Sequence, residues 1–236
     1  MRILITNDDG IHAPQLVNLA RWAEKLGQVT VVAPKVEQSG KSQGIELHEP
    51  FEVKQVEISS GISAWSVDST PADCIRFALF GLNQTFDLVI SGINRGFNIG
   101  TDIMYSGTVG AAFEAVSLGM KAIALSTSPE YYESAANHLD QIFDYVFEND
   151  LLSLCSAYNV NITPPGERIL ITRQGGHYYS DDFVPVGNNL YQAKGKFVYQ
   201  DSDDDTLDTD AVMHGNISIM PLTIDRCNMD VYHKLK

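Results

Sequence analysis

Two neighbouring aspartates, Asp8 and Asp9, follow almost directly on an apolar run at residues 2–6 and precede a glycine. The apolar run predicts a buried strand that presents both acids near its carboxyl end. Two carboxylates about 4 Å apart repel one another by roughly 4 kcal/mol at an effective dielectric constant near 20, so a cation would stabilise this pair. The same residue types also favour a turn and the start of a helix. Both a metal site and a capped turn are consistent with these ten residues.

Two further loops at the ends of predicted strands carry oxygen donors. The first contains Gln38-Ser-Gly40, and the second reads Ser91-Gly-Ile-Asn-Arg-Gly-Phe-Asn-Ile-Gly100. The carboxyl ends of parallel strands meet at one edge of a sheet, where ligands of such folds bind. The three loops together offer two carboxylates, a hydroxyl and amide oxygens, which suit magnesium, manganese or calcium better than zinc or copper.

A predicted helix at residues 106–118 begins with Ser106, Gly107 and Thr108. The free amides and the positive dipole end of a helix bind phosphate oxygens without a lysine. Each loop also has an ordinary structural explanation when it is taken alone. Ser39-Gly40 is compatible with a turn, Ser91-Gly92 with a tight connection, and Ser106 or Thr108 with a helix cap.

The elements that must position these loops alternate along the first 150 residues. Apolar periodicity predicts strands at 2–6, 28–33, 51–58, 64–67, 86–90 and 121–125, and helices at 14–26, 71–82, 106–118 and 134–156. This order is typical of a doubly wound, mainly parallel, Rossmann-like α/β sheet.

Beyond residue 159 the pattern changes to strands without intervening helices, at 160–162, 168–172 and 217–222. Residues 175–199 predict a β-hairpin. We therefore expect one domain over residues 1–236, with a hairpin extension at about 173–215 and a tail at 224–236. The acidic run 201–210 has aspartates at alternate positions, but it lacks the glycine and the final glutamate of an EF-hand, so it predicts a solvated loop.

Composition excludes several classes of protein. The 236 residues include 16 basic and 30 acidic side chains, a net charge of −14, so we expect no binding to nucleic-acid polymers or anionic membranes. The three cysteines have no metal-binding spacing. No secretory leader or apolar run of about 18 residues is visible, and we expect a cytoplasmic protein.

The predicted hairpin carries six aromatic residues, which is more than a lone hairpin can bury: Tyr178, Tyr179, Phe183, Tyr191, Phe197 and Tyr199. An exposed patch of this kind marks an interface. We expect a homodimer or a homotetramer.

Three segments resemble signature segments of the stationary-phase survival protein SurE family, a family of metal-dependent nucleotidases. They are Ile5-Thr-Asn-Asp-Asp-Gly10, Ser91-Gly-Ile-Asn-Arg-Gly-Phe-Asn-Ile-Gly100 and Tyr105-Ser-Gly-Thr-Val-Gly-Ala-Ala112. Thr70-Pro-Ala-Asp-Cys74, Asn159-Val-Asn161 and Asp208-Thr-Asp-Ala-Val212 also resemble the family, so the likeness covers nearly the whole chain.

The resemblance implies a phosphomonoesterase that acts on nucleoside 5′-monophosphates and often on 3′-monophosphates, with some members acting on short polyphosphate. It implies one divalent ion per subunit, magnesium or manganese, held by Asp8, Asp9, Ser39 and Asn94. It implies phosphate binding by Asn98, Ser106, Gly107 and Thr108. It also implies exchange of the C-terminal tail between subunits.

Other phosphate chemistries fit the residues less well. Gly40-Lys41-Ser42 resembles the end of a Walker loop, but Lys35 stands where the first glycine is required. The glycines of segment 91–100 do not match the dinucleotide pattern. A dehalogenase-type phosphatase needs Asp-x-Asp after the first strand, and a receiver domain needs an aspartate after its third strand, where this chain has Ser91-Gly92.

No nucleophilic carboxylate stands in the usual place, so direct attack by metal-activated water is the favoured mechanism, with Asp8 or Asp9 accepting the proton. The alternative is a metal-dependent nucleotide-binding sensor without turnover. The sequence separates the two poorly, because both would use the same pocket.

Overall fold

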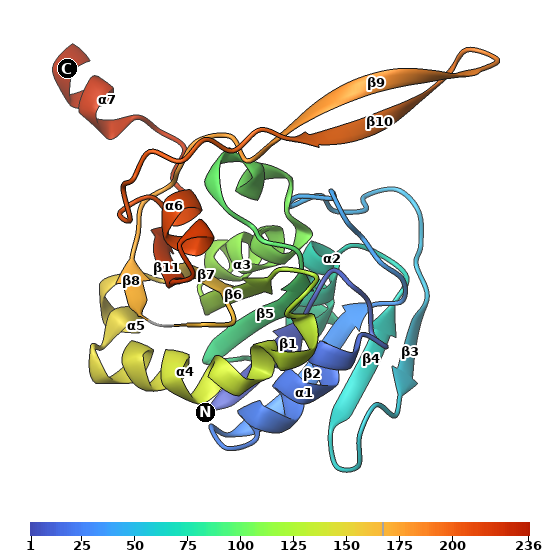
Figure 1. The fold of residues 1–236 in the computed structure, drawn as a ribbon. Coiled ribbons are helices and arrows are strands. Elements are labelled where there is room, and N and C mark those ends of the chain that lie inside the picture. The colour runs from blue at the N-terminus through green and yellow to red at the C-terminus, as the bar shows by residue number, and fades with distance from the viewer. Residues whose placement is uncertain (167) are drawn as a thin grey trace.

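The computed structural model describes residues 1–166 and 168–236, and within them a nine-stranded sheet has the order β3-β4-β2-β1-β5-β6-β7-β11-β8 (Figure 1). The strands are β1 (Arg2–Thr6), β2 (Gln28–Pro34), β3 (Val53–Val56), β4 (Ser63–Val67), β5 (Leu88–Arg95), β6 (Lys121–Thr127), β7 (Ala157–Ile162), β8 (Ile169–Ile171) and β11 (Ile217–Leu222). The six strands from β4 to β7 pair in parallel, whereas β3 and β11 are antiparallel to their neighbours β4 and β7. The predicted doubly wound, mainly parallel α/β fold is confirmed.

Helices cover both faces of this sheet (Figure 1). They are α1 (Pro14–Ala23), α2 (Pro71–Arg76), η1 (Phe77–Gly81), η2 (Gly100–Tyr105), α3 (Gly107–Ser117), η3 (Tyr132–His138), α4 (Leu139–Glu148), α5 (Leu151–Leu154), α6 (Asp208–Met213) and α7 (Met229–Leu235). Within the described ranges, no helix is long and apolar enough to cross a bilayer.

The central strand β1 supplies both hydrophobic cores. Ile3 and Ile5 pack in the core that includes residues of α1 and α4, while Leu4 packs in the core that includes residues of α2 and α3. Successive side chains of a strand point to opposite faces, which accounts for this division. Because β1 is buried on both sides, the residues that follow it emerge at a rigid edge of the sheet.

Several predicted boundaries differ from the structure. The strand predicted at 86–90 continues to Arg95, because β5 resumes pairing with β6 after a register shift between Ser91 and Asn94. Such a bulge changes where the following side chains point. The helix predicted at 134–156 is divided into η3, α4 and α5, with Asp150 in a left-handed conformation at the second break (φ 48°).

The hairpin predicted at residues 175–199 is present as β9 (Tyr179–Gly187) and β10 (Leu190–Phe197), and it projects away from the body of the molecule (Figure 1). Asn188 and Asn189 at its tip both have positive φ, as a two-residue hairpin turn requires. Helix α7 also lies away from the sheet, and all its residues are exposed.

The prediction of a solvated loop at 201–210 is wrong for its last three residues. Asp208, Thr209 and Asp210 are buried at the start of α6. The Asp210 carboxylate accepts hydrogen bonds from the backbone N–H groups of Ser202 and Asp204. A buried carboxylate is tolerated when it is hydrogen-bonded in this way, so acidic residues alone do not indicate exposure.

The stability of the fold should depend on pH through His214, whose ring contacts two aspartates of this acidic segment. Its two ring nitrogens contact Asp205 (2.6 Å) and Asp201 (3.1 Å), and these contacts raise the pKa of His214 to about 9. The protonated ring therefore stabilises the fold fully below an unfolded pKa of about 6.5, and this contribution is lost as the pH rises through about 9. We expect the melting temperature to decrease over this interval in the wild type and to decrease less in His214→Gln. Parallel melting curves against pH for the two proteins would contradict this assignment.

Candidate functional site

Asp8 lies just beyond the end of β1 and is almost completely buried. Its carboxylate accepts a hydrogen bond from the Thr108 hydroxyl (2.5 Å), and its backbone carbonyl accepts one from the N–H of Gln38 (2.8 Å). A Cβ atom at Gly107 would lie only 3.0 Å from Asp8 Cβ, so the absence of a side chain at Gly107 lets α3 approach the acid closely. The first loop, the second loop and the N-terminus of α3 thus meet at Asp8.

The capped-turn interpretation does not account for the two acids. Helix α1 begins after Ala13, and its N-cap makes no side-chain hydrogen bond. The turn is closed instead by Asn7, whose side chain exchanges hydrogen bonds with the backbone N–H and carbonyl of Gly10. Neither Asp8 nor Asp9 caps α1 or closes this turn, so their carboxylates are free of both structural roles.

Asp9 is half-buried, and its surroundings hold its carboxylate in place. It accepts a hydrogen bond from the backbone N–H of Arg95 (3.1 Å) at the end of β5, and the nearby Tyr132 of η3 lowers its pKa. Burial raises the pKa of Tyr132, so its hydroxyl stays protonated. The sequence did not single out Tyr132, because only the fold brings η3 to this edge.

Both carboxylates are destabilised as anions. Burial raises the pKa of Asp8 to about 6, and the neighbouring Asp9 adds to the rise, while the hydrogen bond from Thr108 opposes it. Burial also raises the pKa of Asp9. Two adjacent acids whose ionised forms are disfavoured in this way fit a site that a divalent cation would neutralise.

The donor set is made of oxygen atoms. Within residues 1–166 and 168–236, no three His, Cys, Asp or Glu side chains are grouped as a metal site. A cation at Asp8 and Asp9 would therefore complete its shell with neutral oxygens and water, as magnesium and manganese commonly do.

The two predicted neutral ligands differ in how they are held. Asn94 is half-buried on β5, and its Nδ2 group donates to the carbonyl of Gly96 (2.8 Å), which leaves the amide oxygen as its ligand atom. Ser39 is exposed, and its hydroxyl donates to Glu37 (2.7 Å). Ser39 directly follows Gln38, whose backbone N–H donates to the carbonyl of Asp8, so Ser39 lies near the two aspartates. Its hydroxyl, however, is already hydrogen-bonded to Glu37 rather than directed to the aspartates.

Asn98 is anchored by polar residues of two strands. Its backbone N–H donates to Asn161 (2.9 Å) and its carbonyl accepts from Asn159 and Asn161 of β7. Its side-chain amide donates one hydrogen to Ser126 of β6 (2.7 Å), which leaves a second hydrogen for a ligand. The sequence did not indicate Ser126 as part of the site, whereas Asn159 and Asn161, the alternating asparagines of β7, already stood out in the sequence.

The start of α3 combines a cap with a contact to Asp8. The Ser106 hydroxyl accepts a hydrogen bond from the N–H of Val109 (3.1 Å), so the capping interpretation of Ser106 is confirmed. Thr108 is fully buried and donates to Asp8 rather than capping the helix. The backbone amides of the first turn remain the groups suited to phosphate.

Asp208 is a further residue that was not predicted as part of the site. It is fully buried, and its carboxylate accepts hydrogen bonds from the backbone N–H groups of Gly100 (2.9 Å) and Gly175 (2.7 Å). Gly100 lies between Asn98 and Ser106, so α6 fastens the segment that joins the two predicted phosphate-binding residues.

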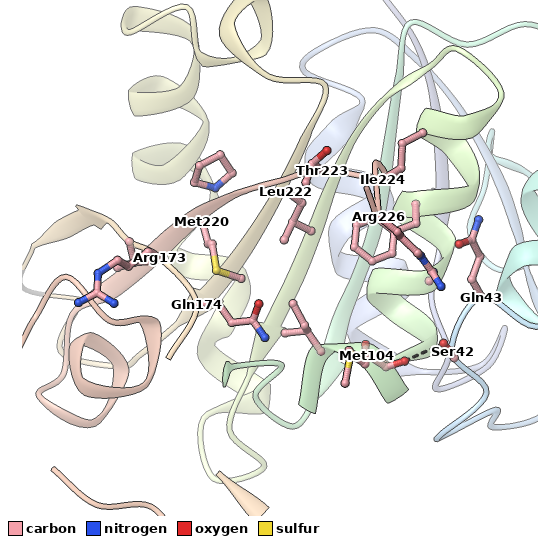
Figure 2. A pocket seen from close by; sticks show the side chains of 16 residues that line it. Ser42, Gln43, Met104, Arg173, Gln174, Met220, Leu222, Thr223, Ile224 and Arg226 are labelled. Atoms are coloured by element: carbon pink, nitrogen blue, oxygen red, sulfur yellow. Dashed lines mark hydrogen bonds between the residues drawn. The ribbon is translucent and has the colours of Figure 1, made fainter. Parts of the chain in front are cut away.

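A cavity of about 530 Å³, drawn in Figure 2, borders helix α3. Its wall includes Ser106, Gly110 and Phe113, which share one face of the helix, together with the end of β11 and the residues that follow it. Asp8 instead contacts Gly107 and Thr108. The cavity is therefore not the space in front of the two carboxylates.

The chain is similar to known proteins over its whole length. The family described as "Survival protein SurE" matches residues 3–181. The protein from Geobacter sulfurreducens named "5'-nucleotidase SurE" is 41% identical over 97% of this chain and 90% of its own length. The protein of the same name from Thermosipho africanus is 36% identical, over 100% and 96% respectively.

A solved structure agrees with this likeness. The SurE protein from Aquifex aeolicus superimposes with a TM-score of 0.82 at 32% identity, covering 100% of this chain and 98% of that one. Paired acids after β1, the asparagine-bearing extension of β5 and the capped start of α3 occur here on a fold shared with that protein, and the family match spans all three. The chain belongs to the SurE family.

Proposed function

We propose that this protein is a metal-dependent phosphomonoesterase that releases phosphate from nucleoside 5′-monophosphates. The family and the relatives named as 5'-nucleotidases support phosphate-ester hydrolysis. The observation that carries the metal dependence is the placement of two adjacent carboxylates, the buried Asp8 and the half-buried Asp9, beyond the carboxyl end of β1. A non-catalytic sensor would use the same pocket, so release of phosphate is what separates the enzyme from the sensor.

In this proposal Asp8, Asp9, Asn94 and Ser39 hold one divalent ion, magnesium or manganese. Such an ion neutralises charge on the phosphoryl oxygens and lowers the pKa of a bound water. Asn98 and the first turn of α3 at Ser106, Gly107 and Thr108 hold the phosphate. Water attacks phosphorus, the bond from phosphorus to the ester oxygen breaks, one of the two acids accepts the proton of the water, and the nucleoside leaves with a proton from solvent.

The direct test is phosphate release from a panel of esters, with and without chelator. We expect release from nucleoside 5′-monophosphates to stop in excess chelator and to return with magnesium or manganese. Nucleoside 3′-monophosphates and short polyphosphate belong in the same panel. Binding of nucleotide with metal but without release of phosphate would support the sensor instead.

We also propose that the hairpin β9–β10 and the tail at 224–236 are oligomerisation elements, and we expect a homodimer or homotetramer. Phe183 and Tyr191 on the hairpin are each 66% exposed, and α7 exposes Tyr232 and Leu235. Apolar surface of this extent is unfavourable in a monomer. Light scattering at micromolar concentration should give a multiple of 26.0 kDa, and a mass of 26.0 kDa would refute the proposal.

We place the enzyme in a reducing compartment, the cytoplasm. Cys74, Cys155 and Cys227 are free thiols, and Cys74 is buried in the core. Free thiols of this kind are typical of proteins from reducing compartments.

A further inference from the structure

The segment that carries Ser39 joins β2 to β3 at residues 35–52 and forms neither a helix nor a strand. Ser39 is exposed, and its hydroxyl bond to Glu37 (2.7 Å) stays within the same segment. The residue before it is fixed, because the backbone N–H of Gln38 donates to the carbonyl of Asp8 (2.8 Å). The position of Ser39 therefore depends on where the chain is attached on its other side.

Ser42 provides this second attachment, to the end of η2. Its backbone N–H donates to the carbonyl of Tyr105 (3.1 Å). Its hydroxyl donates to the carbonyl of Met104 (2.7 Å), a bond drawn as a dashed line in Figure 2. Met104 and Tyr105 directly precede Ser106, where the predicted phosphate-binding turn begins. The chain on the far side of Ser39 is thus attached to the segment that leads into the phosphate-binding residues.

Helix α3 receives both loops on one face, which contains Gly107, Gly110 and Glu114. Residues at these spacings lie on neighbouring turns of the same side of a helix. Gly107 lies against Asp8, as described above. A Cβ atom at Gly110 would collide with the carbonyl oxygen of Ser42, so the absence of a side chain lets the loop backbone touch the helix. The two loops that carry predicted metal ligands therefore share one support.

Glu114 completes this face with a charged group. It is buried, and its carboxylate accepts a hydrogen bond from the side-chain amide of Gln43 (2.9 Å). The same carboxylate pairs with the guanidinium of Arg76 on α2 (3.0 Å). A buried carboxylate needs such partners, and hydrogen bonds to a charged group are stronger than those between neutral groups. The amide of Gln43 therefore ties the loop to a fixed point one turn beyond Gly110.

We infer that Ser42 and Gln43 are positioning residues of the metal site. They hold loop 38–44 against η2 and α3, so that the short span from Ser39 to Lys41 places the Ser39 hydroxyl beside the two aspartates. Neither residue is itself a proposed ligand. The inference rests on the proposed metal-dependent hydrolysis and deepens it, because it makes the affinity for the ion depend on contacts beyond the ligands.

The test measures the Kd for Mn²⁺ by titration calorimetry on the metal-free protein. Gln43→Leu removes the amide donor with little change in size and leaves Glu114 paired with Arg76, so Kd should rise about tenfold. Ser42→Gly removes the hydroxyl bond and suits the positive φ of this position (54°), and Kd should rise about threefold. In Gln43→Leu, excess Mn²⁺ should return phosphate release from AMP to the wild-type rate, since the change weakens only the affinity for the ion.

A double-mutant cycle shows whether Gln43 acts through Ser39. Ser39→Ala should itself raise the Kd for Mn²⁺, because it removes a proposed ligand. In the Ser39→Ala background, Gln43→Leu should change Kd by less than about twofold, since no hydroxyl is left to place. A contact that only stabilises the fold would lower the melting temperature and leave the Kd for Mn²⁺ unchanged.

Gln141→Leu is the matched control, because Gln141 is exposed on α4, which packs in the other core from α3. It should leave the Kd for Mn²⁺ unchanged. An unchanged Kd in both Gln43→Leu and Ser42→Gly, an unchanged Kd in Ser39→Ala, or additive effects in the double variant would overturn this inference. A wild type that hydrolyses AMP would leave the proposed function standing in each case. No release of phosphate from any ester by the metal-loaded wild type would instead overturn the proposed function.

Discussion

Phosphate release should fall at least about a hundredfold in Asp8→Asn and in Asp9→Asn, because each change removes a ligand and a negative charge from the proposed metal site. Phosphate monoesters are among the slowest substrates to hydrolyse unaided, so loss of the ion leaves little catalysis. In metal-free buffer, the melting temperature of both variants should hold or rise, since one of two adjacent, mutually repelling acids becomes neutral. Activity and melting are measured on the same preparations.

Asp144→Asn is the matched control, because Asp144 is an exposed acid on α4. It should change neither activity nor melting. Variants at Asp8 and Asp9 that stay active and melt earlier without metal would show that the two acids are structural, and the assignment of catalysis to this site would be wrong.

The second large effect is expected at Thr108. Thr108→Val removes the hydroxyl that donates to the buried Asp8 carboxylate, and an unpaired charged acceptor costs roughly 1 to 3 kcal/mol, equivalent to about 5- to 150-fold in turnover. Thr108→Ser keeps the hydroxyl and should retain most of the activity. If Val and Ser variants had equal kinetics, the contact to Asp8 would not matter for catalysis.

Ser106→Ala separates capping from phosphate binding. Loss of the hydrogen bond to the N–H of Val109 should lower the free energy of unfolding by about 1 kcal/mol. If Ser106 also binds phosphate, KM should rise as well, which loss of a cap alone would not cause. Urea unfolding and steady-state kinetics measure the two effects independently.

The fold was largely predictable because its signals are local. Alternation of apolar runs and amphipathic segments was enough to predict the parallel sheet, and the glycine- and aromatic-rich stretch at 175–199 predicted the hairpin. The extension of β5 beyond its bulge was not predictable, since it depends on pairing with β6. The burial of Asp208 and Asp210 was missed for a similar reason, because their hydrogen-bond partners come from other parts of the fold.

The candidate site was predictable in its residue types but not in its contacts. Asp8 and Thr108 were both candidates, yet their hydrogen bond joins residues 100 positions apart and gives Thr108 a different partner from the predicted phosphate. Asn98 was a candidate, whereas its support by Ser126 and the β7 asparagines depends on strand order. Long-range packing, which no local pattern reports, decides which donors remain free for a ligand.

The hydrogen bond from the N–H of Gly100 to the Asp208 carboxylate joins residues 108 positions apart in the chain. This separation has a consequence for how the protein is synthesised. A nascent chain that has emerged only to β10 already carries every proposed metal and phosphate ligand, but not the carboxylate that fastens the segment between Asn98 and Ser106. Competence for catalysis should therefore come late in translation, when α6 leaves the ribosome and docks. A chain that terminates prematurely before α6 would hold all the named ligands and still lack an ordered site.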